Sequence, residues 1–159
     1  MSKQPHRRKP AGASLSQHHS DKKTGVLLKH RFPARAKELC ETRSAVRNCL
    51  AHTGCTSNAV EDIVLAIDEA CQNIIRHAYQ GETDEEIILQ IAREKDVLQI
   101  TLEDSAPEVS ADCMKPRELE DLRPGGLGCH FIKQVMDEVS VGPSPSRRGN
   151  ILKMSKRLQ

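Results

Sequence analysis

Two residue types that can carry chemistry stand four positions apart, at Glu69 and Asn73, in the stretch AVEDIVLAIDEACQNIIRHAY (residues 59–79). Residues four apart on a helix project from one face, and Arg76 and His77 continue that face. An amide oxygen suits Mg²⁺, and a glutamate can accept a proton from an attacking hydroxyl. An isolated pair of this kind is also typical of a solvated helix face.

A third polar residue, Asp104, follows an apolar run and begins the sequence DSAP. A carboxylate at the end of a strand can accept a hydrogen bond from an exocyclic amine such as that of adenine. The small side chain of Ala106 would let a flat base approach the backbone. An aspartate here also commonly starts a turn, and standing alone it favours the turn.

A glycine-rich run, Gly125-Gly126-Leu127-Gly128, precedes a predicted helix. Glycines let the backbone wrap an anion, and the free N–H groups of a helix N-terminus attract phosphate. A plain loop-to-helix turn uses glycines as well. The sequence has neither the G-x-x-x-x-G-K-[ST] phosphate loop nor the protein-kinase catalytic loop, so nucleotide binding would depend on these other pieces.

The elements that must position these residues follow from apolar periodicity. Residues 59–79 form the main core helix, with Ser57 or Asn58 as its cap and Glu61 completing a capping box. Further helices are predicted at 34–52 and 129–137. Strands are predicted at 26–32, 87–93, 97–103, 139–141 and 150–156.

Short turns between the strands, among them residues 142–146, predict a mixed, mostly antiparallel sheet with three helices on one face. The fold class is therefore α/β, a two-layer sandwich. Residues 105–124 contain three prolines and are too long for an ordinary connection, so they are predicted to form a lid. A short helix is expected within it, near residues 115–121.

Composition separates a basic tail from a mildly acidic domain. Residues 1–23 hold six Lys or Arg and one Asp, and they are expected to be disordered. Residues 24–159 hold 18 basic and 21 acidic residues and are predicted to be one domain. With three aromatic residues in the chain, base stacking is not expected, so nucleic acid is not the predicted partner.

The chain shows no apolar run long enough to span a membrane and no signal-peptide pattern. Its six cysteines include no C-x-x-C pair, and several occupy apolar helix positions. Buried, reduced thiols are therefore expected rather than disulfides or a zinc site. These features together predict a cytoplasmic protein without a membrane partner.

The motifs gain specificity from their order. E-A-x-x-N-x-x-x-H-A-Y on a helix, D-x-A beginning 31 residues after the asparagine, and G-G-L-G before another helix resemble the GHKL ATPases. That superfamily includes gyrase, Hsp90, histidine kinases and MutL. The runs GGLGCHFIKQVMDEV and GNILKMSKRL further resemble the bacterial anti-sigma-factor serine/threonine kinases. The resemblance covers residues 26–158.

The resemblance implies the Bergerat ATP-binding fold with ATP and Mg²⁺ as cofactors. Glu69 would be the general base acting on a protein serine, and Asn73 would hold Mg²⁺. Asp104 would bind the adenine amino group. The positions implied to contact the nucleotide are Asn73, His77, Asp104, Ala106, Gly126, Leu127, Gly128 and Asn150.

The same resemblance implies the partners. The family binds a sigma factor, phosphorylates a STAS-domain antagonist on serine, and often forms homodimers. Two positions depart from the family pattern, since Ala106 replaces a glycine and Asn150 replaces a threonine. Arg123 is a candidate for a lid arginine, against the alternative of a solvated side chain.

Two other functions stay open. The departures leave room for a nucleotide-binding partner-switching module without kinase turnover. The catalytic domain of a histidine kinase is less expected, because no dimerising helical hairpin with a phosphoacceptor histidine precedes the domain in this sequence.

Overall fold

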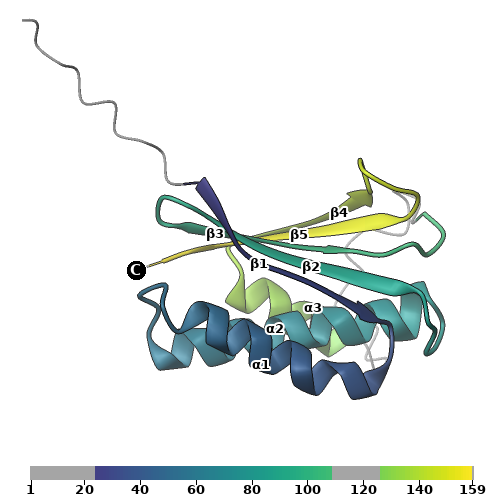
Figure 1. Ribbon diagram of the computed structural model, residues 1–159, viewed down its shortest axis with the longest axis horizontal. Coiled ribbons are helices and arrows are strands. Elements are labelled where there is room, and N and C mark those ends of the chain that lie inside the picture. The colour runs from purple at the N-terminus through teal and green to yellow at the C-terminus, as the bar shows by residue number, and fades with distance from the viewer. Residues whose placement is uncertain (1–23, 109–125, 159) are drawn as a thin grey trace, which may run out of the picture.

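One antiparallel sheet and a layer of helices on one of its faces make up the computed structural model, which describes residues 24–108 and 126–158 (Figure 1). The strands are β1 (Thr24–Pro33), β2 (Glu86–Glu94), β3 (Val97–Glu103), β4 (Glu138–Pro143) and β5 (Asn150–Arg157). The helices are α1 (Leu39–Leu50), α2 (Ser57–Asn73) and α3 (Gly126–Val135), with a 3₁₀ turn η1 (Ala36–Glu38) and a π-helical segment η2 (Ile74–Ala78).

The strand order is β1-β2-β3-β5-β4, and all four pairings in the described residues are antiparallel. Figure 1 shows the three α-helices beneath the sheet, which leaves its other face uncovered. The predicted two-layer α/β sandwich is thus confirmed. Strand β5 lies between β3 and β4, so the last hairpin brings the chain back to the middle of the sheet.

Alternation along the strands fills the layer between sheet and helices. Ile91 of β2 pairs with Ile100 of β3, which pairs with Met154 of β5, and all three side chains are buried. Helix α2 covers this row with an apolar stripe at helical spacing. Its buried residues are Val60, Ile63, Val64, Ala66, Ile67, Ala70 and Cys71.

The start of α2 differs from the sequence prediction. Thr56 is the N-cap residue, and its Oγ1 accepts a hydrogen bond from the backbone N–H of Ala59 at 3.3 Å. Neither Ser57 nor Asn58 caps the helix, because both lie inside its first turn. The side chain of Glu61 forms no capping box and instead accepts two hydrogen bonds from Arg47 of α1, at 2.6 and 2.9 Å. That ion pair lowers the pKa of Glu61.

Other boundaries also moved. The predicted helix 34–52 is the 3₁₀ turn η1 followed by α1, and the last helix begins at Gly126 rather than Cys129. The turn predicted at 142–146 starts later, because Gly142 and Pro143 complete β4 and the loop begins at Ser144. Most of the predicted lid, its short helix and Arg123 lie outside the described residues.

The cysteines only partly match their prediction. Cys71 is fully buried, and its burial strongly raises the pKa of its thiol. Cys49 and Cys55 are half-buried, whereas Cys40 and Cys129 are exposed. All five described cysteines are free. Of the helices in the described ranges, none combines the length and apolarity that a membrane crossing requires.

Candidate nucleotide site

The last turn of α2 carries the Glu69–Asn73 pair on a partly exposed face, while the opposite face is buried in the core. The Asn73 side-chain oxygen Oδ1 is shielded from solvent and has no hydrogen-bond partner among the described residues. Its Nδ2 lies 3.8 Å from the Sγ atom of Cys129 in the first turns of α3. Asn73 therefore joins α2 to the helix that the glycine-rich run opens.

An unpartnered buried carbonyl oxygen is uncommon, because leaving such a group unsatisfied costs about 1–3 kcal/mol. In asparagines with a structural role, this oxygen normally accepts a hydrogen bond from a backbone N–H. The Asn73 oxygen is available to an external partner, and its chemistry is that of a hard ligand.

The Glu69 carboxylate is similarly uncommitted. Within residues 24–108 and 126–158, no hydrogen bond or ion pair involves it. The neighbouring acid Asp68, by contrast, accepts hydrogen bonds from Arg43 and Gln72, both at 2.8 Å. Asp68 thus links α2 to α1, whereas the neighbouring Glu69 is available to accept a proton.

Asp104 is buried at the end of β3, at 4% exposure, and is fixed by the start of β5. Its Oδ1 accepts hydrogen bonds from the backbone N–H of Ala106 and from Nδ2 of Asn150, both at 3.0 Å. The first of these bonds is the turn that the sequence also suggested for this aspartate. Both bonds use Oδ1, so they leave the second carboxylate oxygen, Oδ2, to other donors.

Gly149 allows this arrangement. Its φ is +128°, and a Cβ atom built on it would lie 1.9 Å from the Asp104 backbone oxygen. Only glycine lets the two backbones approach so closely. The close approach allows two reciprocal backbone hydrogen bonds. Asp104 N–H donates to Asn150 O at 3.0 Å, and Asn150 N–H donates to Asp104 O at 3.3 Å.

Tyr79 ties the end of α2 to the loop after β3, a role that the sequence did not reveal. Its hydroxyl accepts a hydrogen bond from the backbone N–H of Ser105 at 2.8 Å and donates one to the carbonyl of Glu86 at 3.0 Å. The Ser105 side chain also contacts the hydroxyl, at 3.0 Å. The only signal in the sequence was the position of Tyr79 at the end of the E-A-x-x-N-x-x-x-H-A-Y motif.

Three motifs far apart in the chain are therefore linked by contacts. Asn73 reaches Cys129, Tyr79 reaches Ser105 beside Asp104, and Asp104 reaches Asn150. His77 is exposed and has no hydrogen-bond or ionic partner within the described residues. The backbone of Gly126, Leu127 and Gly128 forms the first turn of α3. Their predicted phosphate contacts stay a prediction.

The donor set suits one cation in particular. No group of three or more His, Cys, Asp or Glu side chains able to hold a metal occurs in the described part of the chain. Mg²⁺ does not need such a cage, because it keeps several waters and binds one or two protein oxygens together with substrate phosphates. The free Oδ1 of Asn73 fits that requirement.

Comparison with known proteins gives this geometry a family. A sequence profile for the histidine kinase-like ATPase domain matches residues 32–156, which contain every described residue of the linked motifs. The chain belongs to the histidine kinase-like ATPase domain family. The resemblance to the GHKL ATPases drawn from the motifs is thereby confirmed.

Among curated members of this family, the serine-protein kinase RsbW of Listeria monocytogenes is 29% identical over 118 residues, covering 69% of this chain and 75% of its own. Two solved structures share the fold. The RsbU and RsbW domains of a Mycobacterium tuberculosis protein superpose with a TM-score of 0.59 at 19% identity, over 82% of this chain and 32% of that one.

The second solved structure is the SiaB–SiaC complex of Pseudomonas aeruginosa, with a TM-score of 0.58 and 18% identity over 82% of this chain and 89% of that chain. The chain spans about a third of the Mycobacterium tuberculosis chain and most of the Pseudomonas one. The family match shows an ATPase-like domain, and the relatives that resemble it include proteins named serine-protein kinase.

Proposed function

We propose that this protein is an ATP- and Mg²⁺-dependent protein serine kinase that also acts as an anti-sigma factor in the cytoplasm. It binds a sigma factor and phosphorylates a STAS-domain antagonist of that factor on a serine. The relatives named serine-protein kinase support the reaction class. The observation that carries the proposal is the shielded, unpartnered Oδ1 of Asn73, one turn beyond the uncommitted Glu69.

In the proposed reaction the serine hydroxyl oxygen attacks the γ-phosphorus of ATP. Its proton passes to the Glu69 carboxylate, the bond from the γ-phosphorus to the bridging oxygen breaks, and ADP leaves. Mg²⁺, when bound, would neutralise phosphate charge, and Asn73 Oδ1 would be its protein ligand. Phosphoryl transfer depends chiefly on such positioning and charge neutralisation.

The adenine end of the site would be read by Asp104, whose Oδ2 accepts the exocyclic amine while Oδ1 stays bonded to Ala106 and Asn150. Ala106 is buried beside it, so a small side chain is required there. His77 and the turn Gly126–Gly128 complete the proposed nucleotide contacts. Asn150 acts mainly by holding Asp104.

Partner binding is supported by the fold neighbour SiaB, which was solved in complex with SiaC. A homodimer of this chain is part of the proposal, as in the family that the sequence resembles.

The test is a transfer assay with γ-labelled ATP, Mg²⁺ and STAS-domain proteins of the host. We expect phosphoserine on one of them. Glu69→Gln should keep ATP affinity within about twofold and lower transfer by at least a hundredfold, because general bases contribute about 10²–10⁴. Asp62→Asn removes an exposed acid from the same helix and should transfer at the wild-type rate.

Two results would contradict these assignments. Full activity of Glu69→Gln would remove Glu69 as the base. Tight ATP binding by the wild-type chain without transfer to any STAS-domain protein would favour the partner-switching module that does not turn over.

A further inference from the structure

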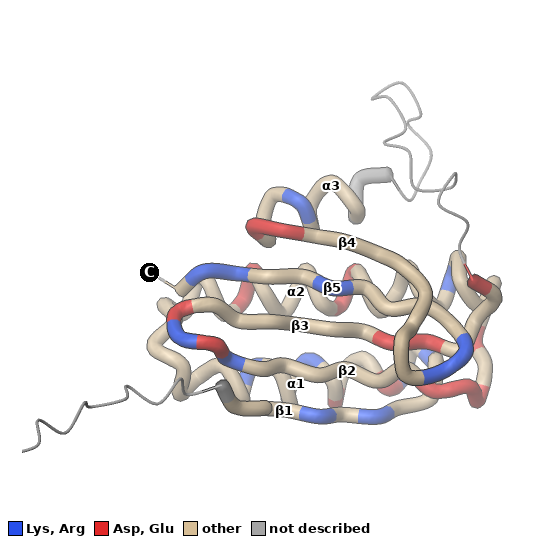
Figure 2. Tube along the Cα trace, turned by 90° about the horizontal axis from the view of Figure 1, so that it is seen from above, with Lys and Arg blue, Asp and Glu red and all other residues tan. Residues whose placement is uncertain are grey.

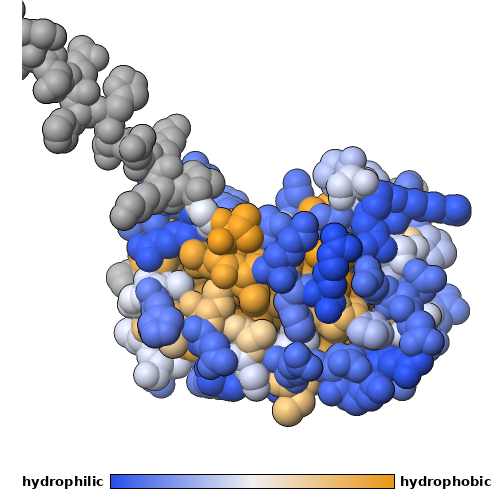
Figure 3. Space-filling view, in the orientation of Figure 1, coloured by the Kyte–Doolittle hydropathy of each residue, from blue (hydrophilic) through white to orange (hydrophobic). Residues whose placement is uncertain are grey.

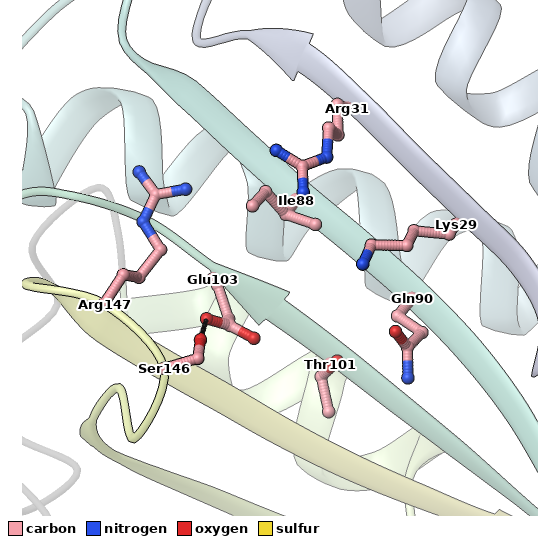
Figure 4. A pocket seen from close by; sticks show the side chains of 8 residues that line it. All are labelled: Lys29, Arg31, Ile88, Gln90, Thr101, Glu103, Ser146 and Arg147. Atoms are coloured by element: carbon pink, nitrogen blue, oxygen red, sulfur yellow. Dashed lines mark hydrogen bonds between the residues drawn. The ribbon is translucent and has the colours of Figure 1, made fainter.

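A groove of about 470 Å³ lies on the sheet face that the helices leave uncovered (Figure 4). It crosses from β1 to the loop between β4 and β5. We call it the outer groove, and its lining residues are Lys29, Arg31, Ile88, Gln90, Thr101, Glu103, Ser146 and Arg147. None of them belongs to the candidate nucleotide site.

Basic side chains line the groove on two sides. Lys29 and Arg31 stand on β1, and Arg147 reaches in from the β4–β5 loop on the other side. Figure 4 shows the Arg31 guanidinium close to Ile88 and the Arg147 side chain on the opposite side of the groove. Arg31 has Glu86 at 3.6 Å, but both side chains are about half-exposed, so this pair is weak.

Glu103, the one acidic residue in the lining, already accepts hydrogen bonds from the β4–β5 loop. Glu103 Oε2 accepts hydrogen bonds from the hydroxyls of Ser144 and Ser146, at 2.8 and 2.7 Å. These bonds fold the β4–β5 loop over the end of β3, as Figure 2 shows from above. Glu103 therefore holds the far wall in place, and the three basic side chains are left facing the groove.

Strand register extends the positive charge across the sheet. Lys29 pairs with Gln90, Gln90 with Thr101, and Thr101 with Lys153, an exposed residue of β5. Paired residues on neighbouring strands point to the same face. This row therefore places a lysine at each end, with an amide and a hydroxyl between them.

We propose that the outer groove binds an extended, acidic segment of a partner protein. The cations stand apart on two walls instead of converging on a point, which suits several spaced carboxylates better than one phosphate. Gln90 and Thr101 offer hydrogen bonds to a peptide backbone, and Ile88 at the floor offers an apolar contact. Charge complementarity of this kind selects the partner and speeds encounter.

Other anionic partners fit less well. The described outer face carries no aromatic side chain for base stacking, because Phe32, Tyr79 and Phe131 all pack against the core. The exposed apolar residues of β1, Val26 and Leu27, lie near its start, where Figure 3 shows an apolar patch, and not in the groove lining. That separation disfavours a membrane surface.

A second copy of the chain is also disfavoured. A twofold contact between two outer faces would bring the basic side chains of one copy next to the same side chains of the other. Like charges that face each other across an interface weaken binding. The proposal is independent of the kinase assignment, because the groove and the candidate nucleotide site lie on opposite faces of the sheet.

The test uses the full-length, ¹⁵N-labelled chain and a synthetic peptide of alternating aspartate and serine. We expect the backbone amide signals of Gln90 and Thr101 to shift on titration, with an affinity that falls as salt rises. Reading these amides separates groove binding from any contact with the basic residues 1–23. The double variant Arg31→Gln/Arg147→Gln should bind the peptide about tenfold more weakly at the groove.

The matched control is Lys37→Gln/Lys133→Gln, which removes the same charge from exposed positions on the helical side. It should bind like the wild-type chain, and thermal unfolding should show that both double variants are folded. Equal loss in both variants, or no loss in the groove variant, would overturn the proposal. So would tighter groove binding by oligothymidine or by phosphatidylserine vesicles, or groove-dependent dimerisation in sedimentation.

Discussion

The side-chain oxygen of Asn73 makes no hydrogen bond to another described residue, so it adds no hydrogen-bond energy to the fold. The Oδ1 atom is shielded and unpartnered within the described residues, where Nδ2 makes one weak contact, to the Cys129 sulfur at 3.8 Å. A group that costs stability when nothing is bound is a strong sign of a ligand site. This reasoning predicts opposite effects of one substitution on binding and on stability.

Asn73→Ala should lose Mg²⁺-dependent ATP binding while leaving the melting temperature unchanged or raised. In isothermal titration calorimetry, wild-type affinity should fall about 10–100-fold on adding EDTA, and the variant should show the weak affinity in both conditions. Gln72→Ala changes the neighbouring side chain, which bonds Asp68 instead, and should keep the metal dependence. A large loss of stability in Asn73→Ala would mean that its role is structural.

Gly149 predicts a stability effect at a position with no side chain. Gly149→Ala would place Cβ 1.9 Å from the Asp104 backbone oxygen at a φ of +128°, so the hairpin must move. We expect a loss of about 3 kcal/mol in the free energy of unfolding, measured by urea denaturation. Gly142→Ala in β4 meets nothing within 4 Å and should cost less than about 1 kcal/mol. Equal costs at the two glycines would contradict this account.

At the residue scale, spacing singled out Glu69 and Asn73, but only the order of the later motifs separated the pair from a solvated helix face. Spacing was not enough for Tyr79, because the hydroxyl's partner is the backbone of Ser105, 26 residues away. Backbone donors carry no sequence signal, and their location depends on the tertiary fold. Asn150, which bonds Asp104, was singled out only because the family resemblance placed it at the nucleotide.

At the scale of elements, the end of α2 matters most. The sequence predicts one helix through Tyr79, whereas the structure changes to π-helical hydrogen bonding from Ile74 to Ala78. Apolar periodicity does not separate α- from π-helical turns over so few residues. Such π segments often occur at functional sites, and this one directly follows Asn73 and immediately precedes Tyr79.

Tyr79→Phe tests whether this segment positions the Asp104 loop. The change removes the hydroxyl that accepts the Ser105 N–H and should cost about 1–2 kcal/mol of unfolding free energy. Affinity for ADP should also fall, because Ser105 adjoins Asp104. Ser105→Ala keeps the backbone bond and should have a smaller effect on both. Unchanged ADP affinity in Tyr79→Phe would show that the link does not position the loop.

Helix caps illustrate a second limit at this scale. Threonine, serine and asparagine follow one another at Thr56, Ser57 and Asn58, and all three are good N-cap residues. Which of them caps depends on where the chain leaves α1, and that turn is set by packing. Glu61 would complete a capping box with Asn58, but its two carboxylate oxygens accept hydrogen bonds from Arg47 instead.

At the scale of the molecule, alternating strands and amphipathic helices were sufficient to predict the two-layer sandwich. The insertion of β5 between β3 and β4 was not foreseen, because strand order depends on pairings that local patterns do not encode. The outer groove was also missed. Its cations come from β1 and from the β4–β5 loop, which are more than a hundred residues apart.

The proposed division at residue 24 predicts that residues 24–159 fold and bind ATP without residues 1–23. Residues 1–23 contain almost no large apolar side chain, so removing the tail should change the free energy of unfolding by less than about 0.5 kcal/mol. Urea denaturation and ATP titration of the shortened chain would measure both. A loss above about 1 kcal/mol, or weaker ATP binding, would assign the tail a part in the domain.

Adjacent residues at the end of β3 point to opposite faces, with Glu103 bonded to Ser144 and Ser146 outside and Asp104 bonded to Asn150 inside. One short hairpin, residues 144–150, is thus shared by the outer groove and the nucleotide site. A substitution of Lys29 or Arg31 would leave the adenine contact unchanged. A substitution in this hairpin would alter the outer groove and the nucleotide site together. Epistasis between the two faces should therefore concentrate there.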